Sequence, residues 1–156
     1  MAQSTLKTAW INRPMRTMLA QLVAAFTALN TMLTELFTDT VVTYAVDLHA
    51  SKTYYNVFYA KRGYTVTSID WVSDIAQAIT GTVVKATGTA VPAVGTTPMH
   101  TANGVLINTT ASTVLPITLT GTSANLVLAA GDRIGFVLNA ALTTGSGLLT
   151  IRMTRS

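Results

Sequence analysis

The stretch Met15–Phe37, MRTMLAQLVAAFTALNTMLTELF, constrains the fold most, because large apolar residues recur in it at intervals of seven. Such heptad spacing is typical of an α-helix that packs along one side against other helices. Three parallel rows share the spacing, so the apolar stripe is wider than a two-row seam. The rows are Met15, Leu22, Leu29 and Leu36; Met18, Ala25 and Met32; and Leu19, Phe26 and Leu33. We therefore predict an amphipathic helix over residues 15–38 that needs a partner for this stripe.

Two kinds of partner fit the stripe: a sheet face of the same chain, or the same helix in other copies. Charged residues make up only 10% of the chain, against about a quarter in an average domain. So few charges suggest that partner chains cover much of the surface. A wide stripe favours three or more helices over two. We predict a homotrimer with the three rows at its core, and packing of the helix on its own sheet stays open as the alternative.

Residues 1–14 show no strong period and are predicted to form an N-terminal arm. Leu6, Trp10 and Ile11 are its apolar anchors, and we expect the arm to dock on another surface through them. Pro14 is predicted to lie in the first turn of the helix, where its missing N–H has no helical partner to lose.

From Val41 onward the apolar residues alternate with a period of two, which is typical of β-strands. Turn signals rich in Gly, Pro, Asn and Asp separate short runs about every ten residues. Thr53–Ala60 and Tyr64–Val72 are predicted to form a hairpin around Lys61-Arg62-Gly63, with positive φ open to Gly63. The predicted strands are Val41–Leu48, Thr53–Ala60, Tyr64–Val72, Ile79–Ala86, Gly104–Asn108, Thr113–Leu119, Leu126–Ala129, Arg133–Leu138 and Leu148–Thr154.

This order of elements predicts a mainly β protein: an antiparallel, jelly-roll-like β-sandwich preceded by one N-terminal amphipathic α-helix. The length of 156 residues suits one domain plus an appendage. We therefore divide the chain into an arm at 1–14, a helix at 15–38 and a β-domain at 40–156.

Groups suited to catalysis or metal binding are sparse. The chain has no cysteine, two histidines and six acids. Asp47 and His49 share a strand face and resemble two metal ligands without a third. Asp70 and Asp74 flank Trp71, as paired carboxylates do in some glycosidases, but turn and cap roles explain them better. We predict no enzyme activity, no metal and no cofactor.

Nucleic acid and membrane are not predicted as partners either. The net charge is +4, yet the Lys and Arg residues are scattered and form no dense basic run. Gln21, Thr27 and Asn30 interrupt the best apolar run before it reaches the length of a membrane span.

The C-terminal third carries a family resemblance. Leu126–Leu138, LVLAAGDRIGFVL, is followed by a Gly-rich turn and by Gly147–Met153, GLLTIRM. This order resembles the end of small jelly-roll proteins on the heads of tailed phages, in which an L-x-x-G-D-x-[IL] turn precedes the penultimate strand. Tyr64–Val72 and Ala76–Thr87 look like earlier strands of the same group, so the resemblance covers about Thr53–Thr154.

The resemblance implies a head decoration protein or head fibre that is made in the host cytoplasm and acts on the virion. Our first hypothesis is a homotrimer that binds the major capsid protein on the outer shell and stabilises it. Leu6, Trp10, Ile11 and Arg13 would make the capsid contact. The alternative is a fibre-tip module that binds a receptor or glycan around Tyr54, Tyr55, Tyr59 and Trp71, although these aromatics equally suit core packing.

Overall fold

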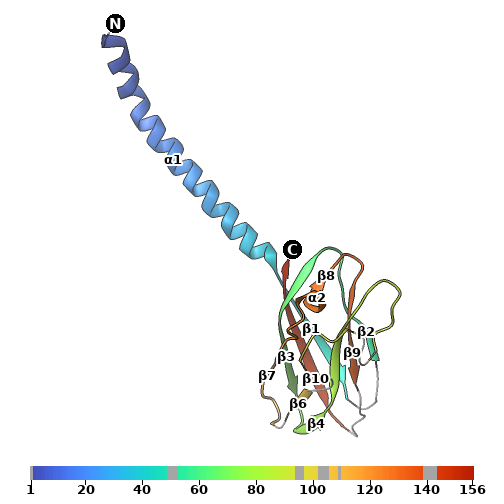
Figure 1. The fold of residues 1–156 in the computed structure, drawn as a ribbon. Helices are drawn as coiled ribbons and strands as arrows, with labels where there is room; N and C mark the ends of the chain where they lie inside the picture. The colour runs from blue at the N-terminus through green and yellow to red at the C-terminus, as the bar shows by residue number, and fades with distance from the viewer. Residues whose placement is uncertain (1, 49–52, 94–96, 102–105, 109, 139–143) are drawn as a thin grey trace. The chain divides into compact units, whose positions relative to one another are not determined.

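A computed structural model describes the backbone of residues 2–48, 53–93, 97–101, 106–108, 110–138 and 144–156. Side chains are described over the same ranges except at 2–14, 35–38, 77–79 and 106–108. The chain divides into two compact units, Met1–Thr38 and Asp39–Ser156. Figure 1 shows a helix in the first unit and a strand-rich domain in the second. The elements are α1 (Ala2–Thr38), β1 (Asp39–Asp47), β2 (Thr53–Tyr59), β3 (Tyr64–Ser73), β4 (Gln77–Ile79), β5 (Gly81–Ala86), β6 (Leu106–Asn108), β7 (Leu115–Ile117), α2 (Ser123–Leu126), β8 (Val127–Leu128), β9 (Arg133–Leu138) and β10 (Ser146–Arg155).

The helix α1 is longer than the sequence predicts, because it begins at Ala2 and not at Met15. The predicted arm is therefore helical in its backbone, and Pro14 lies inside the helix. The segment before Pro14 contains no glycine, so the proline is the strongest helix breaker in this part of the chain. An interior proline removes one backbone hydrogen bond and costs about 3 kcal/mol. The absence of a heptad period before Met15 thus marks the end of the apolar stripe and not the end of the helix.

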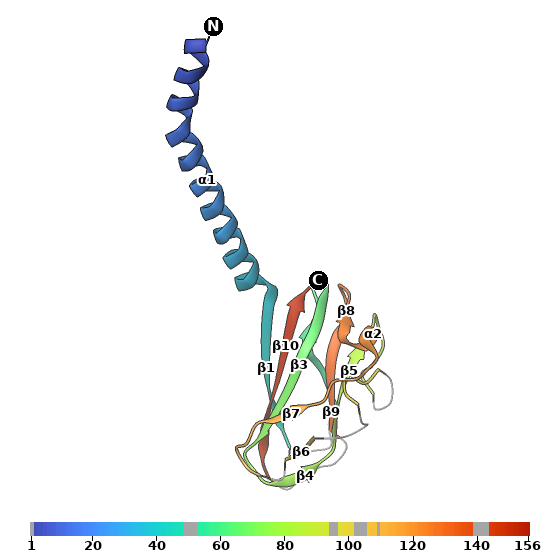
Figure 2. The ribbon, with the colours of Figure 1, turned by 60° about the vertical axis from the view of Figure 1, so that its left-hand side comes forward.

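The second unit is an antiparallel β-sandwich (Figure 2). One sheet has the strand order β1-β10-β3-β7, with β8 also pairing with β3, and the other has the order β2-β9-β5. The short strands β4 and β6 pair separately. Along the chain, β1, β3, β7, β8 and β10 lie in the first sheet, whereas β2, β5 and β9 lie in the second. This repeated crossing between sheets is the jelly-roll arrangement, and it confirms the predicted fold class.

The predicted hairpin is wrong. β2 pairs with β9, and β3 pairs with β10, so the two predicted partners lie in different sheets. The Ala60 amide donates to the Asp132 carbonyl at 2.8 Å, and the Gly131 amide donates to the Ala60 carbonyl at 2.8 Å. The end of β2 is thereby fixed to the turn before β9. Gly63 does not have positive φ, whereas Gly131 does, with φ of 96°.

The core lies between the two sheets. Trp71 of β3 stacks on Phe136 of β9, with ring centroids 5.7 Å apart, so one aromatic pair joins both sheets. Both side chains are fully buried. Buried aliphatic side chains belong to the same core cluster as the pair, and most of them occupy inward positions, which alternate along each strand. The largest of them are Leu48, Ile69, Met99, Leu128, Ile134, Leu138, Leu149 and Ile151.

Candidate interaction surface

The apolar stripe of α1 is exposed along its described length. Every side chain from Met15 to Thr34 is exposed. Phe26 has 63% of its surface exposed, and Leu29, in the middle row, has 52%. Single exposed apolar residues are ordinary, but a contiguous stripe marks an interaction site. The predicted row residues in this segment are Met15, Met18, Leu19, Leu22, Ala25, Phe26, Leu29, Met32 and Leu33, and the structure places all of them on the exposed helix.

Met15, Met18, Leu19 and Leu22 outline a shallow hollow on α1, with Gln21 at its margin. Their positions are i, i+3, i+4 and i+7, which outline a diamond on a helix surface. In helix bundles a side chain of one helix inserts between four residues of the facing helix. The hollow has the composition and spacing of such a receiving site.

The opposite face of α1 carries small and hydroxyl-bearing residues whose polar groups bond within the helix. The Thr27 hydroxyl donates to the Val23 carbonyl at 2.9 Å, and the Thr31 hydroxyl donates to the Thr27 carbonyl at 3.0 Å. These hydroxyls need no outside partner, so the two faces of α1 differ in size and polarity.

By length and composition, Met15–Thr34 would also suffice to cross a membrane.

The remaining predicted contact residues are located by backbone alone. Leu36 lies in the last turns of α1, and Leu6, Trp10, Ile11 and Arg13 lie in its first part. Their side chains are outside the described part of the structure. Their trimer and capsid contacts stay predictions.

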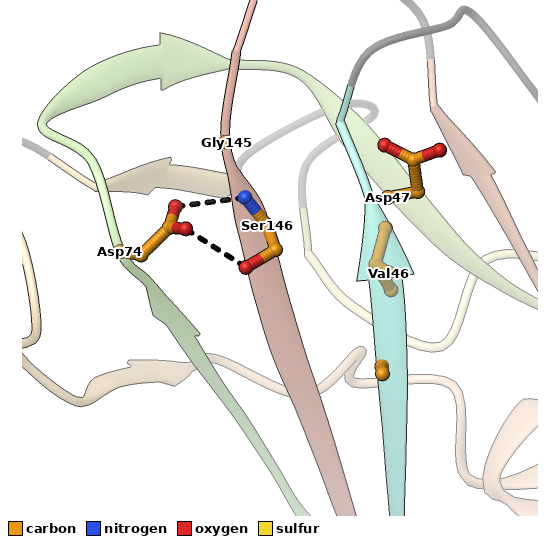
Figure 3. A pocket seen from close by; sticks show the side chains of 6 residues that line it. Val46, Asp47, Asp74, Gly145 and Ser146 are labelled. Atoms are coloured by element: carbon orange, nitrogen blue, oxygen red, sulfur yellow. Dashed lines mark hydrogen bonds between the residues drawn. The ribbon is translucent and has the colours of Figure 1, made fainter.

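Asp70 and Asp74, the predicted candidates for a catalytic pair, have separate surroundings. Asp74 follows β3, and its carboxylate accepts the Ser146 amide at 2.7 Å and the Ser146 hydroxyl at 2.8 Å (Figure 3). It thereby fixes the start of β10. Asp70 lies within β3 opposite Thr150, while Trp71 between the two acids points into the core and is fully buried. The structure gives the aspartates different neighbours rather than one shared cleft.

Asp47 borders a shallow pocket with Asp74, Gly145 and Ser146 at the ends of β1 and β10 (Figure 3). The Asp47 amide donates to the Tyr54 hydroxyl at 2.9 Å, and that hydroxyl donates to the Asp47 carbonyl at 2.7 Å. Burial raises the pKa of Tyr54, so the phenol stays neutral and makes both bonds. His49 lies outside the described residues. Among the described side chains, no three of His, Asp and Glu gather as metal ligands would.

The other histidine has a structural position. His100 is buried, and its Nε2 accepts the Val83 amide at 3.2 Å. That bond joins the segment around His100 to β5.

The aromatic residues of the alternative hypothesis do not form one groove. Tyr54 and Trp71 are buried in the core, whereas Tyr55 and Tyr59 are about half exposed on β2. Tyr54 and Trp71 therefore pack in the core, as the core-packing interpretation expects. The four aromatic side chains do not form a shared surface groove for a receptor or glycan.

The structure adds one surface that sequence reasoning missed. β1 lies at the edge of its sheet, with Val41, Thr43 and Ala45 exposed. The charge-free stretch between Asp39 and Asp47 is visible in the sequence, but the edge position of the strand depends on pairings between distant segments.

Comparisons with known proteins bear on the fold. No protein-family model matches the sequence, and no curated protein matches it. A chain of the cyanophage Pam1 capsid asymmetric unit matches with a TM-score of 0.51 and 16% sequence identity, covering 77% of this chain and 88% of that chain. A chain of the capsid of Ralstonia phage GP4 matches with a TM-score of 0.49 and 10% identity, covering 77% and 86%. At 16% identity, the Pam1 match shows a shared fold.

Proposed function

We propose that this chain is a non-enzymatic structural protein of a phage virion, which assembles as a homotrimer through α1 and decorates the outer capsid shell. The observation that carries the proposal is the exposed three-row stripe of α1. The fold shared with a chain of the Pam1 capsid supports a place on the virion.

Self-association is favoured because it removes the stripe from water. Burying a leucine or phenylalanine side chain contributes about 1.5–3 kcal/mol relative to full exposure. Leu29 and Phe26 have more than half of their surface left to bury. Three helices suit three rows, because the middle row points to the bundle axis and each flanking row meets one neighbour. A membrane span lacks this one-sidedness, since lipid surrounds a helix on all sides.

Oligomer mass tests the trimer. We expect sedimentation of the full chain to give about 50 kDa, three times the chain mass of 16.5 kDa. Leu29→Asp places a carboxylate in the buried row of each copy, and an unpaired buried charge costs several kcal/mol. It should therefore yield monomers. Thr31→Asp adds the same charge on the opposite face and should leave the trimer intact. A monomeric full chain, or one that floats with lipid vesicles, would contradict the proposal.

The capsid contact is assigned to the first part of α1 through Leu6, Trp10, Ile11 and Arg13. Aromatic and arginine side chains are frequent anchors of protein interfaces. Trp10→Ala should weaken binding to phage shells that lack the protein by about tenfold or more while the trimer mass stays unchanged. Equal binding by the variant would remove Trp10 from the contact.

A further inference from the structure

The edge strand β1 is unusually open to pairing. It pairs with β10 over all nine residues in an unbroken register. No other strand among the described residues pairs with its second edge. Between Asp39 and Asp47 it has no charge, no proline and no glycine. Its outward side chains at Val41, Thr43 and Ala45 are exposed.

The other sheet edges carry the features that normally prevent strands from pairing between molecules. Those features are short length, proline, bulges and cover by loops. β2 has a register shift between Tyr54 and Phe58. β7 has only three residues, one of which is Pro116.

The edge of β5 is covered by a later segment. Val84 forms an isolated bridge with Pro98. The Lys85 amide donates to the Thr97 carbonyl, and the Met99 amide donates to the Val83 carbonyl, both at 2.9 Å. β1 therefore differs from β2, β5 and β7 in being long and regular, and its edge is covered only at the end, where the Tyr54 hydroxyl bonds the amide and the carbonyl of Asp47. An edge left in this state would promote aggregation unless an assembly uses it.

We propose that the free edge of β1 is a contact between copies of this chain, made in the same assembly as the α1 bundle. This inference rests on the proposed trimer. α1 ends at Thr38 and β1 begins at Asp39, so no linker separates the two. Packed helices lie about 8–10 Å apart. A bundle therefore brings the first residues of three β1 strands close together, and a second copy is the partner that the edge meets first.

Hydrogen exchange of the β1 amides tests the contact. In the full-length trimer, the amides of Val41, Thr43 and Ala45, which point away from β10, should exchange roughly 100-fold more slowly than in monomers. The Asp47 amide is left out of the comparison, because it already donates to the Tyr54 hydroxyl within one chain. Monomers come from Leu29→Asp, or from diluting the unchanged protein, so the comparison does not depend on one variant. Amides on the open edge of β2 near Asn56 serve as the control and should exchange equally in both states.

The outcomes separate the two proposals. A trimer whose outward β1 amides exchange as fast as in the monomer overturns the edge contact and leaves the trimer standing. If the outward β1 amides exchange slowly only after phage shells are added, the edge binds a shell protein, and the proposed contact between copies is overturned. A full chain that is monomeric overturns both proposals.

Discussion

Gly147 is where a single methyl group should disturb the core most. Gly147 on β10 pairs with Ser73, which makes Trp71 its diagonal neighbour on the inner face. A Cβ added at Gly147 would lie 2.2 Å from Cη2 and 2.3 Å from Cζ2 of Trp71. Carbon atoms in contact lie about 3.5–4.0 Å apart, so the indole would have to move by more than about 1 Å.

The indole has little room to make that movement. It is fully buried and stacked on Phe136, and protein cores are packed as tightly as organic crystals. Overpacking of this kind costs about 1–3 kcal/mol. Replacing glycine by alanine recovers about 0.4–1 kcal/mol through the unfolded chain. The cost exceeds the recovery by about 1 kcal/mol, so we expect Gly147→Ala to lower the free energy of unfolding by about that amount.

Urea unfolding at a fixed chain concentration measures this loss, because the stability of an oligomer depends on concentration. Gly121→Ala is the control, since nothing lies within 4 Å of a Cβ built there. In a Trp71→Phe background the clashing ring atoms are absent, so Gly147→Ala should cost much less, and a double-mutant cycle isolates the coupling. A full-size loss in that background, or no loss in the unchanged protein, would refute the reasoning.

Three further predictions concern the helix and the strand ends. Pro14→Ala should raise the melting temperature of α1, followed by circular dichroism, because an interior proline costs about 3 kcal/mol; an unchanged melt would contradict this. Burial raises the pKa of Tyr54 above its ordinary 10.0, so the stabilisation from the neutral phenol is complete below pH 10 and is lost as the pH rises through the raised value. Tyr54→Phe should remove the part of the stability loss at high pH that comes from ionising this phenol. It should also cost about 1 kcal/mol of unfolding free energy at neutral pH, because the Asp47 amide loses this acceptor; an unchanged pH profile of unfolding would argue against both effects. Asp74→Asn should cost about 1 kcal/mol in thermal unfolding, because Asp74 accepts the two Ser146 bonds on different oxygens and Asn has only one acceptor oxygen. A neutral outcome would show that the bonds contribute nothing net.

The strands could be predicted from sequence because their signal is local. Alternation and turn residues locate Arg133–Leu138 without error, and the other predicted strands overlap those in the structure. Pairing is not local, so the hairpin between β2 and β3 was the natural prediction and is wrong. Short connections usually join neighbouring strands. The connection from β2 to β3 instead crosses from one sheet to the other, and this follows only from the pairing of β2 with β9 and of β3 with β10.

The interaction surface was partly predictable for the same reason. The heptad rows of α1 are a local pattern, and the structure places the described ones on an exposed helix. The start of the helix was missed because the stripe begins at Met15 while the backbone continues helical to Ala2. The open edge of β1 and the contact between Gly147 and Trp71 both depend on register between distant strands, which one sequence does not reveal.

Cryo-electron microscopy of the particles of a phage that encodes this chain tests the central claim most directly. We predict that three copies form each protrusion on the outer shell. Their α1 helices should form a bundle on a three-fold axis, packed through the row of Leu22 and Leu29 and the row of Phe26. Particles that lack the chain, or that hold it as separate single copies with the stripe of α1 uncovered, would contradict the account.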